Sequence, residues 1–183
     1  ETMGRYAGWI ALEAGMAGAA DVILLPELPW SLDAVAAHCR AREAAEGYTL
    51  ICIAEGAHAT GAGLSVAQTI ADSPDPLRLG GVGALLAHQL QPLLNSEVRA
   101  TLLGHVQRGG SPTPFDRVLA TRYGWQAAQQ VRAGHWGGMV TLQGDRPGLV
   151  PLADVAGCRR PVPPDAPLLA AARCLGVCLG TPG

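Results

Sequence analysis

Short apolar runs alternate along the chain with longer segments of helical periodicity. The runs 21–25, 48–54 and 98–103 hold mostly Val, Ile, Leu or Ala, and 138–142 is a fourth, weaker candidate. Continuous apolar runs of this length are typical of strands buried on both faces of a parallel sheet. The sequence therefore predicts several short parallel strands.

Apolar residues at helical spacing fill most of the remaining chain. Ser31 is a good N-cap for one of these helices, and Gly47 is a good stop for it. Residues 66–71 predict one further helical turn, which the Pro-containing segment 73–76 ends. The predicted helices are 7–20, 32–46, 81–94, 114–133 and 168–175. Alternating strands and helices predict an α/β layered fold with a mainly parallel sheet.

Composition narrows the class of protein. The 183 residues could form one domain, or one and part of another, and their formal net charge of −2 does not favour nucleic-acid binding. No run reaches the ~20 apolar residues of a membrane span. The five cysteines are odd in number and form no C-x-x-C motif, which indicates reduced thiols and a cytoplasmic location.

The most informative stretch is Arg99–Arg117, RATLLGHVQRGGSPTPFDR. It places His105 and Arg108 between a predicted strand and a Gly-Gly-Ser-Pro turn that precedes a helix. Turns at the carboxyl ends of strands bind ligands in open α/β sheets. Arginine grips phosphate through its planar fork of donors, so this block predicts a site for a phosphorylated ligand.

This block resembles the signature of the 6-phosphofructokinase family, and 1–9 (ETMGRYAGW) and 20–27 (ADVILLPE) resemble two further family segments in the same order. The resemblance runs from Glu1 to about Leu179 and matches the carboxyl-terminal, sugar-phosphate-binding half of a family member. The Gly-rich donor loop and the aspartate that activates the sugar hydroxyl belong to the other half. We therefore expect residues 1–183 to form a phosphofructokinase-like fold that is incomplete at its amino terminus.

The resemblance implies roles for particular residues. Arg108, with His105 beside it, would bind the 6-phosphate of fructose 6-phosphate, and Glu55 would accept hydrogen bonds from sugar hydroxyls. Met3, Gly4 and Arg5 precede the first helix, whose N-terminal N–H groups favour anions. They would contact the substrate there, and Arg5 would also act in catalysis by stabilising the phosphoryl group in transfer. Each residue also has an alternative without a ligand. Arg108 would be a solvent-exposed turn residue and His105 a core histidine. Arg5 would be an ordinary arginine at a helix start, and Glu55 a solvent-exposed loop carboxylate.

The resemblance also implies a homo-oligomer, a dimer or tetramer. Arg99 and His105 are six residues apart, so their backbones would be separated by ~20 Å in an extended strand. One chain therefore cannot easily bring Arg99 and Arg108 to the same phosphate. In the family the residue matching Arg99 is lent to a neighbouring subunit's site; the alternative is a solvent-exposed strand-start residue.

Several positions bear on regulation. Asp21 matches the acid that ligates an effector's metal ion in regulated bacterial members, so a metal is expected here only if that effector site survives. Ala44 and Glu46 stand where lysines would hold the effector's phosphates, and Gly8-Trp9 replaces a Gly-Asp pair. An acid in place of a cation repels phosphate, so we do not expect nucleotide control.

The expected reaction of the complete enzyme transfers a phosphoryl group, with Mg2+, from ATP or pyrophosphate to the 1-hydroxyl of fructose 6-phosphate. The isolated chain is expected to be inactive. Two alternatives remain at this stage: a non-catalytic sugar-phosphate-binding module, and a structural remnant of a truncated gene.

Overall fold

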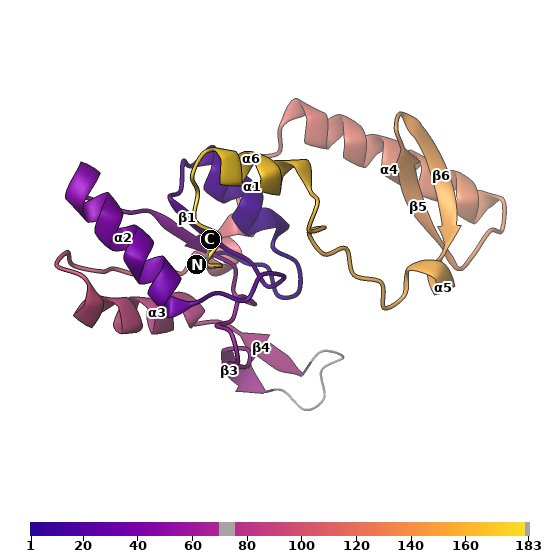
Figure 1. Ribbon diagram of the computed structural model, residues 1–183. Helices are drawn as coiled ribbons and strands as arrows, with labels where there is room; N and C mark the ends of the chain where they lie inside the picture. Colours follow the sequence, from indigo (N-terminus) through magenta and orange to yellow (C-terminus); the bar gives the residue numbers. More distant parts are fainter. Residues whose placement is uncertain (70–75, 182–183) are drawn as a thin grey trace. The chain divides into compact units, whose positions relative to one another are not determined.

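The computed structural model describes residues 1–69 and 76–181. The chain divides into two compact units (Figure 1). The first comprises Glu1–Arg108 and Arg160–Gly183, and the second comprises Gly109–Arg159. Within the described residues, no helix is both long and apolar enough to cross a membrane.

Two parallel strands, β1 (Val22–Leu24) and β2 (Ile51–Ile53), form the centre of the first unit. Its α-helices are α1 (Trp9–Ala17), α2 (Leu32–Glu46), α3 (Val82–Leu90) and α6 (Pro167–Cys174). Two short 3-10 helices, η1 (Gln91–Leu93) and η2 (Gly104–Arg108), come between α3 and α6 in the chain. The fully buried β1 residues alternate between two clusters. Ile23 packs with residues of α1 and α6, whereas Val22 and Leu24 pack with residues of α2 and α3. The unit is therefore an α/β layered fold with helices on both faces of the strands.

Backbone bridges widen this strand pair on both sides. Cys178 lies parallel to Val22 on one side, and Thr2 lies parallel to Ala54 on the other. Both bridges have the same direction as the β1–β2 pair. The prediction of a mainly parallel sheet is thus confirmed for the first unit.

The ends of α2 follow the sequence closely. The Ser31 hydroxyl accepts a hydrogen bond from the Ala34 N–H at 3.4 Å, which satisfies one donor of the first turn. Gly47 takes a left-handed conformation with φ +88° directly after the helix. Glycine adopts that conformation without the steric cost that a Cβ imposes.

The second unit holds one long helix and a hairpin. Its elements are α4 (Pro114–Arg132), β5 (Gly138–Gln143), β6 (Arg146–Pro151) and α5 (Leu152–Val155). Thr113 and Asp116 form a reciprocal capping box at the start of α4. The Thr113 backbone N–H and the Thr113 hydroxyl both donate to the Asp116 carboxylate and lower the pKa of Asp116, the backbone bond most. Asp116 therefore stabilises the first turn of α4. The antiparallel pairing of β5 with β6 was not anticipated.

The predicted helical turn at 66–71 is wrong in its described part. Val66–Thr69 forms strand β3, which pairs antiparallel with β4 (Leu77–Leu79), and the remaining residues of that prediction lie outside the described residues. The physical reason is tertiary pairing: backbone hydrogen bonds to β4 outweigh a weak local preference over four residues.

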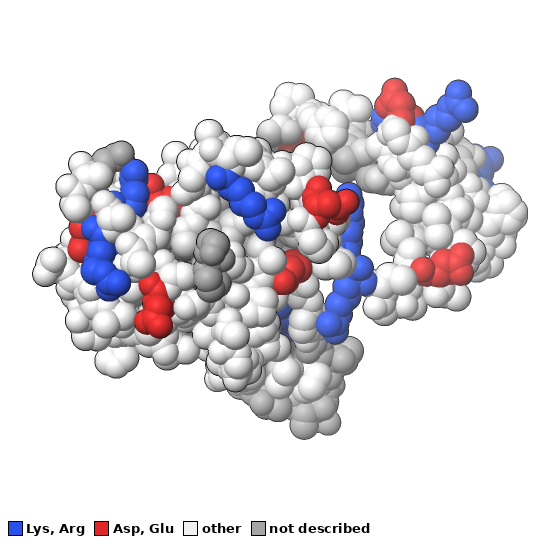
Figure 2. All heavy atoms as spheres, in the orientation of Figure 1, with Lys and Arg blue, Asp and Glu red and all other residues white. Residues whose placement is uncertain are grey.

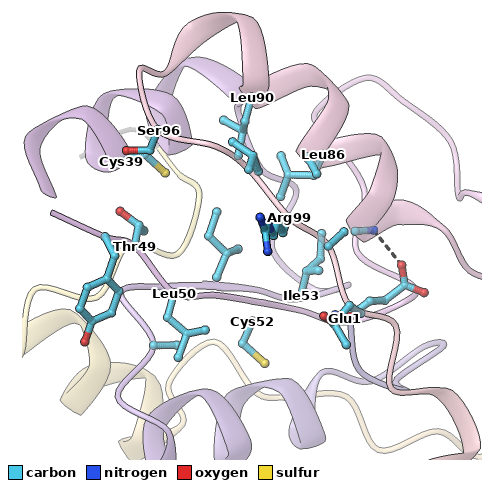
Figure 3. Close-up of a pocket in the computed structure, with 18 of the residues that line it drawn as sticks. Glu1, Cys39, Thr49, Leu50, Cys52, Ile53, Leu86, Leu90, Ser96 and Arg99 are labelled. Carbon is cyan, nitrogen blue, oxygen red and sulfur yellow. Dashed lines mark hydrogen bonds between the residues drawn. The ribbon is translucent and has the colours of Figure 1, made fainter. Parts of the chain in front are cut away.

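The segment 98–103 is not assigned as a strand, contrary to expectation. It pairs at its far end, where the Leu103 N–H donates to the Glu1 carbonyl at 3.0 Å and the Glu1 amino group donates to the Thr101 carbonyl at 2.7 Å. Nearer its start, a cavity of about 540 Å³ lies between this segment, β2 and α3 (Figure 3). Since no described strand lies beside 98–100, the ladder of a strand does not form there.

Two helical glycines, one facing the core and one facing open space, test the packing of α1 against β1. A Cβ at Gly15, in α1, would come within 2.7 Å of Cγ1 of the fully buried Ile23, so Gly15→Ala should destabilise the fold by ~1–3 kcal/mol through overpacking. A Cβ at Gly124, in α4, would meet nothing within 4 Å, so Gly124→Ala should stabilise by ~0.5–1 kcal/mol through helix propensity. Chemical denaturation followed by circular dichroism measures both free energies of unfolding. Equal signs for the two changes would contradict this account.

Candidate functional site

The end of β2 holds the segment Met3–Arg5 through backbone and side-chain contacts. The Glu55 N–H donates to the Thr2 carbonyl at 2.9 Å, and the Gly56 N–H donates to the Gly4 carbonyl at 3.3 Å. The Gly4 N–H in turn donates to Oε1 of Glu55 at 3.4 Å. The structure therefore brings together four residues that the sequence singles out: Met3, Gly4, Arg5 and Glu55.

The start of α1 is not open to an anion in the way the sequence suggests. The Glu27 carboxylate accepts the Gly8 N–H at 3.0 Å and the Val162 N–H at 2.7 Å. An anionic ligand at this helix end would meet a like charge. The Arg5 guanidinium lies 5.9 Å from the Tyr6 ring centroid, ahead of the helix. The N-terminus of α1 is thus already occupied by a carboxylate of the chain itself, contrary to the expectation that its N–H groups are available to an anion.

The short helix η2 carries His105 and Arg108, and both residues are exposed. Gln107 lies between them and is half-buried. Its side-chain Oε1 accepts the Met3 N–H at 2.7 Å, across 104 positions of sequence. The structure thus ties η2 to the Met3–Arg5 segment. Sequence reasoning missed Gln107, although it stands inside the most informative block.

Arg99 lies apart from this cluster. Its guanidinium makes two hydrogen bonds to the Glu97 carboxylate, at 2.9 and 2.8 Å, and its side chain is 80% exposed. The hydrogen bonds to Glu97 raise the pKa of Arg99 above its ordinary value. Arg99 also lines the cavity beside β2 (Figure 3), whose lining does not include Met3, Glu55 or Arg108. One chain therefore does not gather Arg99 with the other site residues.

The same cavity shows a tie that the sequence did not reveal. The Glu1 carboxylate accepts the Gly81 N–H at 3.1 Å and the Gly83 N–H at 2.7 Å, at the start of α3. Figure 3 draws one of these two bonds as a dashed line at Glu1. A negative charge there is favoured by the helix dipole. Cys39 and Cys52 also line this cavity, and burial raises the pKa of both thiols. They are therefore protonated near neutral pH and do not act as thiolates.

Comparison with known proteins identifies the family. The model of the phosphofructokinase family matches residues 1–131. The chain belongs to this family. It is 43% identical to ATP-dependent 6-phosphofructokinase 2 of Clostridium perfringens over 97% of this chain and 49% of the relative. It is 46% identical to the ATP-dependent 6-phosphofructokinase of Chloroflexus aurantiacus over 98% of this chain and 49% of the relative.

The chain thus spans about half the length of the curated phosphofructokinases it matches. Among solved structures, a pyrophosphate-dependent phosphofructokinase from Marinobacter aquaeolei superposes with a TM-score of 0.70 at 24% identity, covering 88% of this chain and 40% of that one. This likeness shows the fold alone. It agrees with an α/β phosphofructokinase fold of which this chain forms part.

Asp21, the residue matched to the metal-ligating acid of regulated phosphofructokinases, is engaged within the chain. Its Oδ1 lies 2.8 Å from Nη2 of Arg42, and its Oδ2 accepts the Leu50 N–H at 2.8 Å. An arginine and a backbone donor thus take the two oxygens that a metal ion would need. This arrangement does not fit an effector metal.

Charges of both signs are mixed on the face drawn in Figure 2, in keeping with the formal net charge of −2. Among the residues described, no group of three or more His, Cys, Asp or Glu could hold a metal ion.

Gly56 tests the packing at the proposed phosphofructokinase site. A Cβ on Gly56 would clash with the carbonyl oxygen of Arg5, so Gly56→Ala must displace the Met3–Arg5 segment. Gly63 is a matched loop control, because a Cβ there meets nothing within 4 Å. We expect Gly56→Ala to shift the amide NMR signals of residues 3–5 and Gly63→Ala to leave them in place. Unchanged signals in Gly56→Ala would show that the close approach is wrong.

Proposed function

We propose that this chain supplies the fructose 6-phosphate site of a 6-phosphofructokinase. The observation that carries the proposal is the meeting of three distant segments, in which Gly4 bonds to Glu55 and Met3 bonds to Gln107. Those bonds gather a carboxylate and arginine-bearing segments at one edge of the strands. That combination suits a ligand with hydroxyl groups and phosphate.

Each residue has a role that follows from its chemistry. Arg108, assisted by His105, binds the 6-phosphate through charge-assisted hydrogen bonds. Glu55 accepts hydrogen bonds from sugar hydroxyls, and Met3 and Gly4 contact the sugar. Arg5 stabilises the charge that develops on the phosphoryl group in transfer, where positioning and electrostatics do most of the work.

The donor would be ATP or pyrophosphate. The curated relatives carry ATP-dependent names, whereas the solved structure at TM-score 0.70 is named pyrophosphate-dependent. Mg2+ would accompany the donor, because this ion is usually held by one or two carboxylates together with the phosphates of a substrate. None of the roles assigned to these residues passes through the ion.

Two arginine variants in a full-length enzyme that carries this chain test the roles. Arg108→Ala should raise KM for fructose 6-phosphate about a hundredfold, since losing a charge-assisted contact costs ~2–3 kcal/mol. Arg5→Ala should lower kcat more than it raises KM, because its contact strengthens in the transition state. Steady-state kinetics measure both effects.

Arg132→Ala, at the exposed end of α4, is the matched control and should change neither constant. Interchanged effects of Arg5→Ala and Arg108→Ala would contradict the assignment. Binding of fructose 6-phosphate without any turnover would favour a non-catalytic sugar-phosphate-binding module, and absence of both would favour a structural remnant. The isolated 183-residue chain should not catalyse phosphoryl transfer to fructose 6-phosphate.

A homo-oligomer with a shared site is also proposed, because Arg99 is engaged with Glu97 away from the Met3–Arg5 segment. In that assembly Arg99 reaches the 6-phosphate bound by a neighbouring subunit. Mixing full-length Arg99→Ala subunits with full-length Arg108→Ala subunits should then restore activity, since some sites regain both arginines. Homo-oligomers of each single variant serve as controls. Hybrids confirmed by native mass spectrometry that stay inactive would contradict the shared site.

A further inference from the structure

We infer that Gln107 is a positioning residue that fixes the distance between the two arginine-bearing segments of the site. Gln107 has been assigned no part in the reaction above. The effect of Gln107 on substrate rests on the proposed function. The hydrogen bond between Gln107 and Met3 rests on the geometry alone.

The geometry of η2 isolates Gln107 from its neighbours. Across residues 101–110, all of which are described, Gln107 alone is not exposed; Val106 beside it is 80% exposed. The other described backbone ties of this region lie at its base, where the Leu103 N–H donates to Glu1 and the Val106 N–H donates to Leu103. η2 thus has little apolar packing to hold it, and a polar contact must orient it.

The Gln107 side-chain amide makes that contact with the Met3–Arg5 segment. Its Oε1 accepts the Met3 N–H at 2.7 Å, a short and part-buried hydrogen bond. The next N–H along the chain, that of Gly4, donates to Glu55 from the other side. The Met3–Arg5 segment is therefore clamped between the end of β2 and η2, and Gln107 is the η2 arm of that clamp.

The clamp links two groups that must act on one ligand. Arg108 directly follows Gln107, and Arg5 lies two residues after Met3. In the proposed function these arginines meet opposite ends of the sugar phosphate, the 6-phosphate and the transferred phosphoryl group. A ligand that spans both can use them together only when their separation is set beforehand. Loss of the Gln107 acceptor lets η2 move independently of Met3.

The first experiment tests the tie in the 183-residue chain. Gln107→Leu keeps the approximate size of the side chain but removes the acceptor, whereas Gln107→Glu keeps an acceptor at the same reach. Val106→Ala perturbs the same helical turn at an exposed position. Amide hydrogen exchange of Met3 should be about tenfold faster or more in Gln107→Leu and close to wild type in Gln107→Glu and Val106→Ala. Equal exchange of Met3 in wild type and Gln107→Leu would overturn the inference.

The second experiment separates positioning from a merely structural role in the full-length enzyme. Gln107→Leu should lower kcat/KM for fructose 6-phosphate roughly fivefold, the effect of one neutral hydrogen bond. In an Arg108→Ala background the same change should have almost no effect, because the separation no longer matters. Equal losses in both backgrounds would show that Gln107 only stabilises the fold. If wild type does not turn over fructose 6-phosphate, the proposed function fails while the exchange experiment still decides the tie.

Discussion

Two residues, Glu1 and Thr2, hold the first unit in register through backbone hydrogen bonds. Thr2 donates to the carbonyl of Ile53 at 2.8 Å and accepts from Glu55, while Glu1 exchanges two backbone bonds with the segment 101–103. These bonds bring the end of β2 and the start of η2 to the same two residues. The functional segments follow immediately on each side, so the geometry of the candidate site depends on this register.

Carboxylates support the same arrangement by binding backbone N–H groups. Glu1 holds the start of α3, Glu27 joins the start of α1 to the returning chain at Val162, and Glu43 accepts the Ser96 N–H at 2.9 Å. The hydrogen bonds from Ser96 lower the pKa of Glu43. A chain without lysine, in which all 13 basic residues are arginine, thus uses acids largely to satisfy loop and helix donors.

Local signals in the sequence predicted what depends on local chemistry. The cap at Ser31 and the stop at Gly47 are each complete within a few residues, and both occur as expected. The capping box at Thr113 is equally local but was not predicted. β1 was also predictable, because a short continuous apolar run ended by Pro26 is typical of a strand covered on both faces, and its three residues are indeed fully buried. The hairpin of β3 and β4 was not, since its stability comes from a partner strand that a short window does not contain.

The candidate site was predictable in its residue types but not in its connections. A pattern of glycines, histidine and arginine indicates phosphate chemistry locally, whereas the bond from Met3 to Gln107 joins residues 104 positions apart. The half-burial of Gln107 between two exposed basic residues is a property of the folded chain, which no periodicity reveals. A long-range bond of this kind does more than add stability. η2 is exposed and has little apolar packing. In our inference the hydrogen-bond acceptor of Gln107 therefore holds Arg108 in a fixed position relative to Arg5, and without it η2 moves independently of the Met3–Arg5 segment. In the proposed site a neutral amide therefore sets the relation between the two arginines, beside the charges that would bind the ligand.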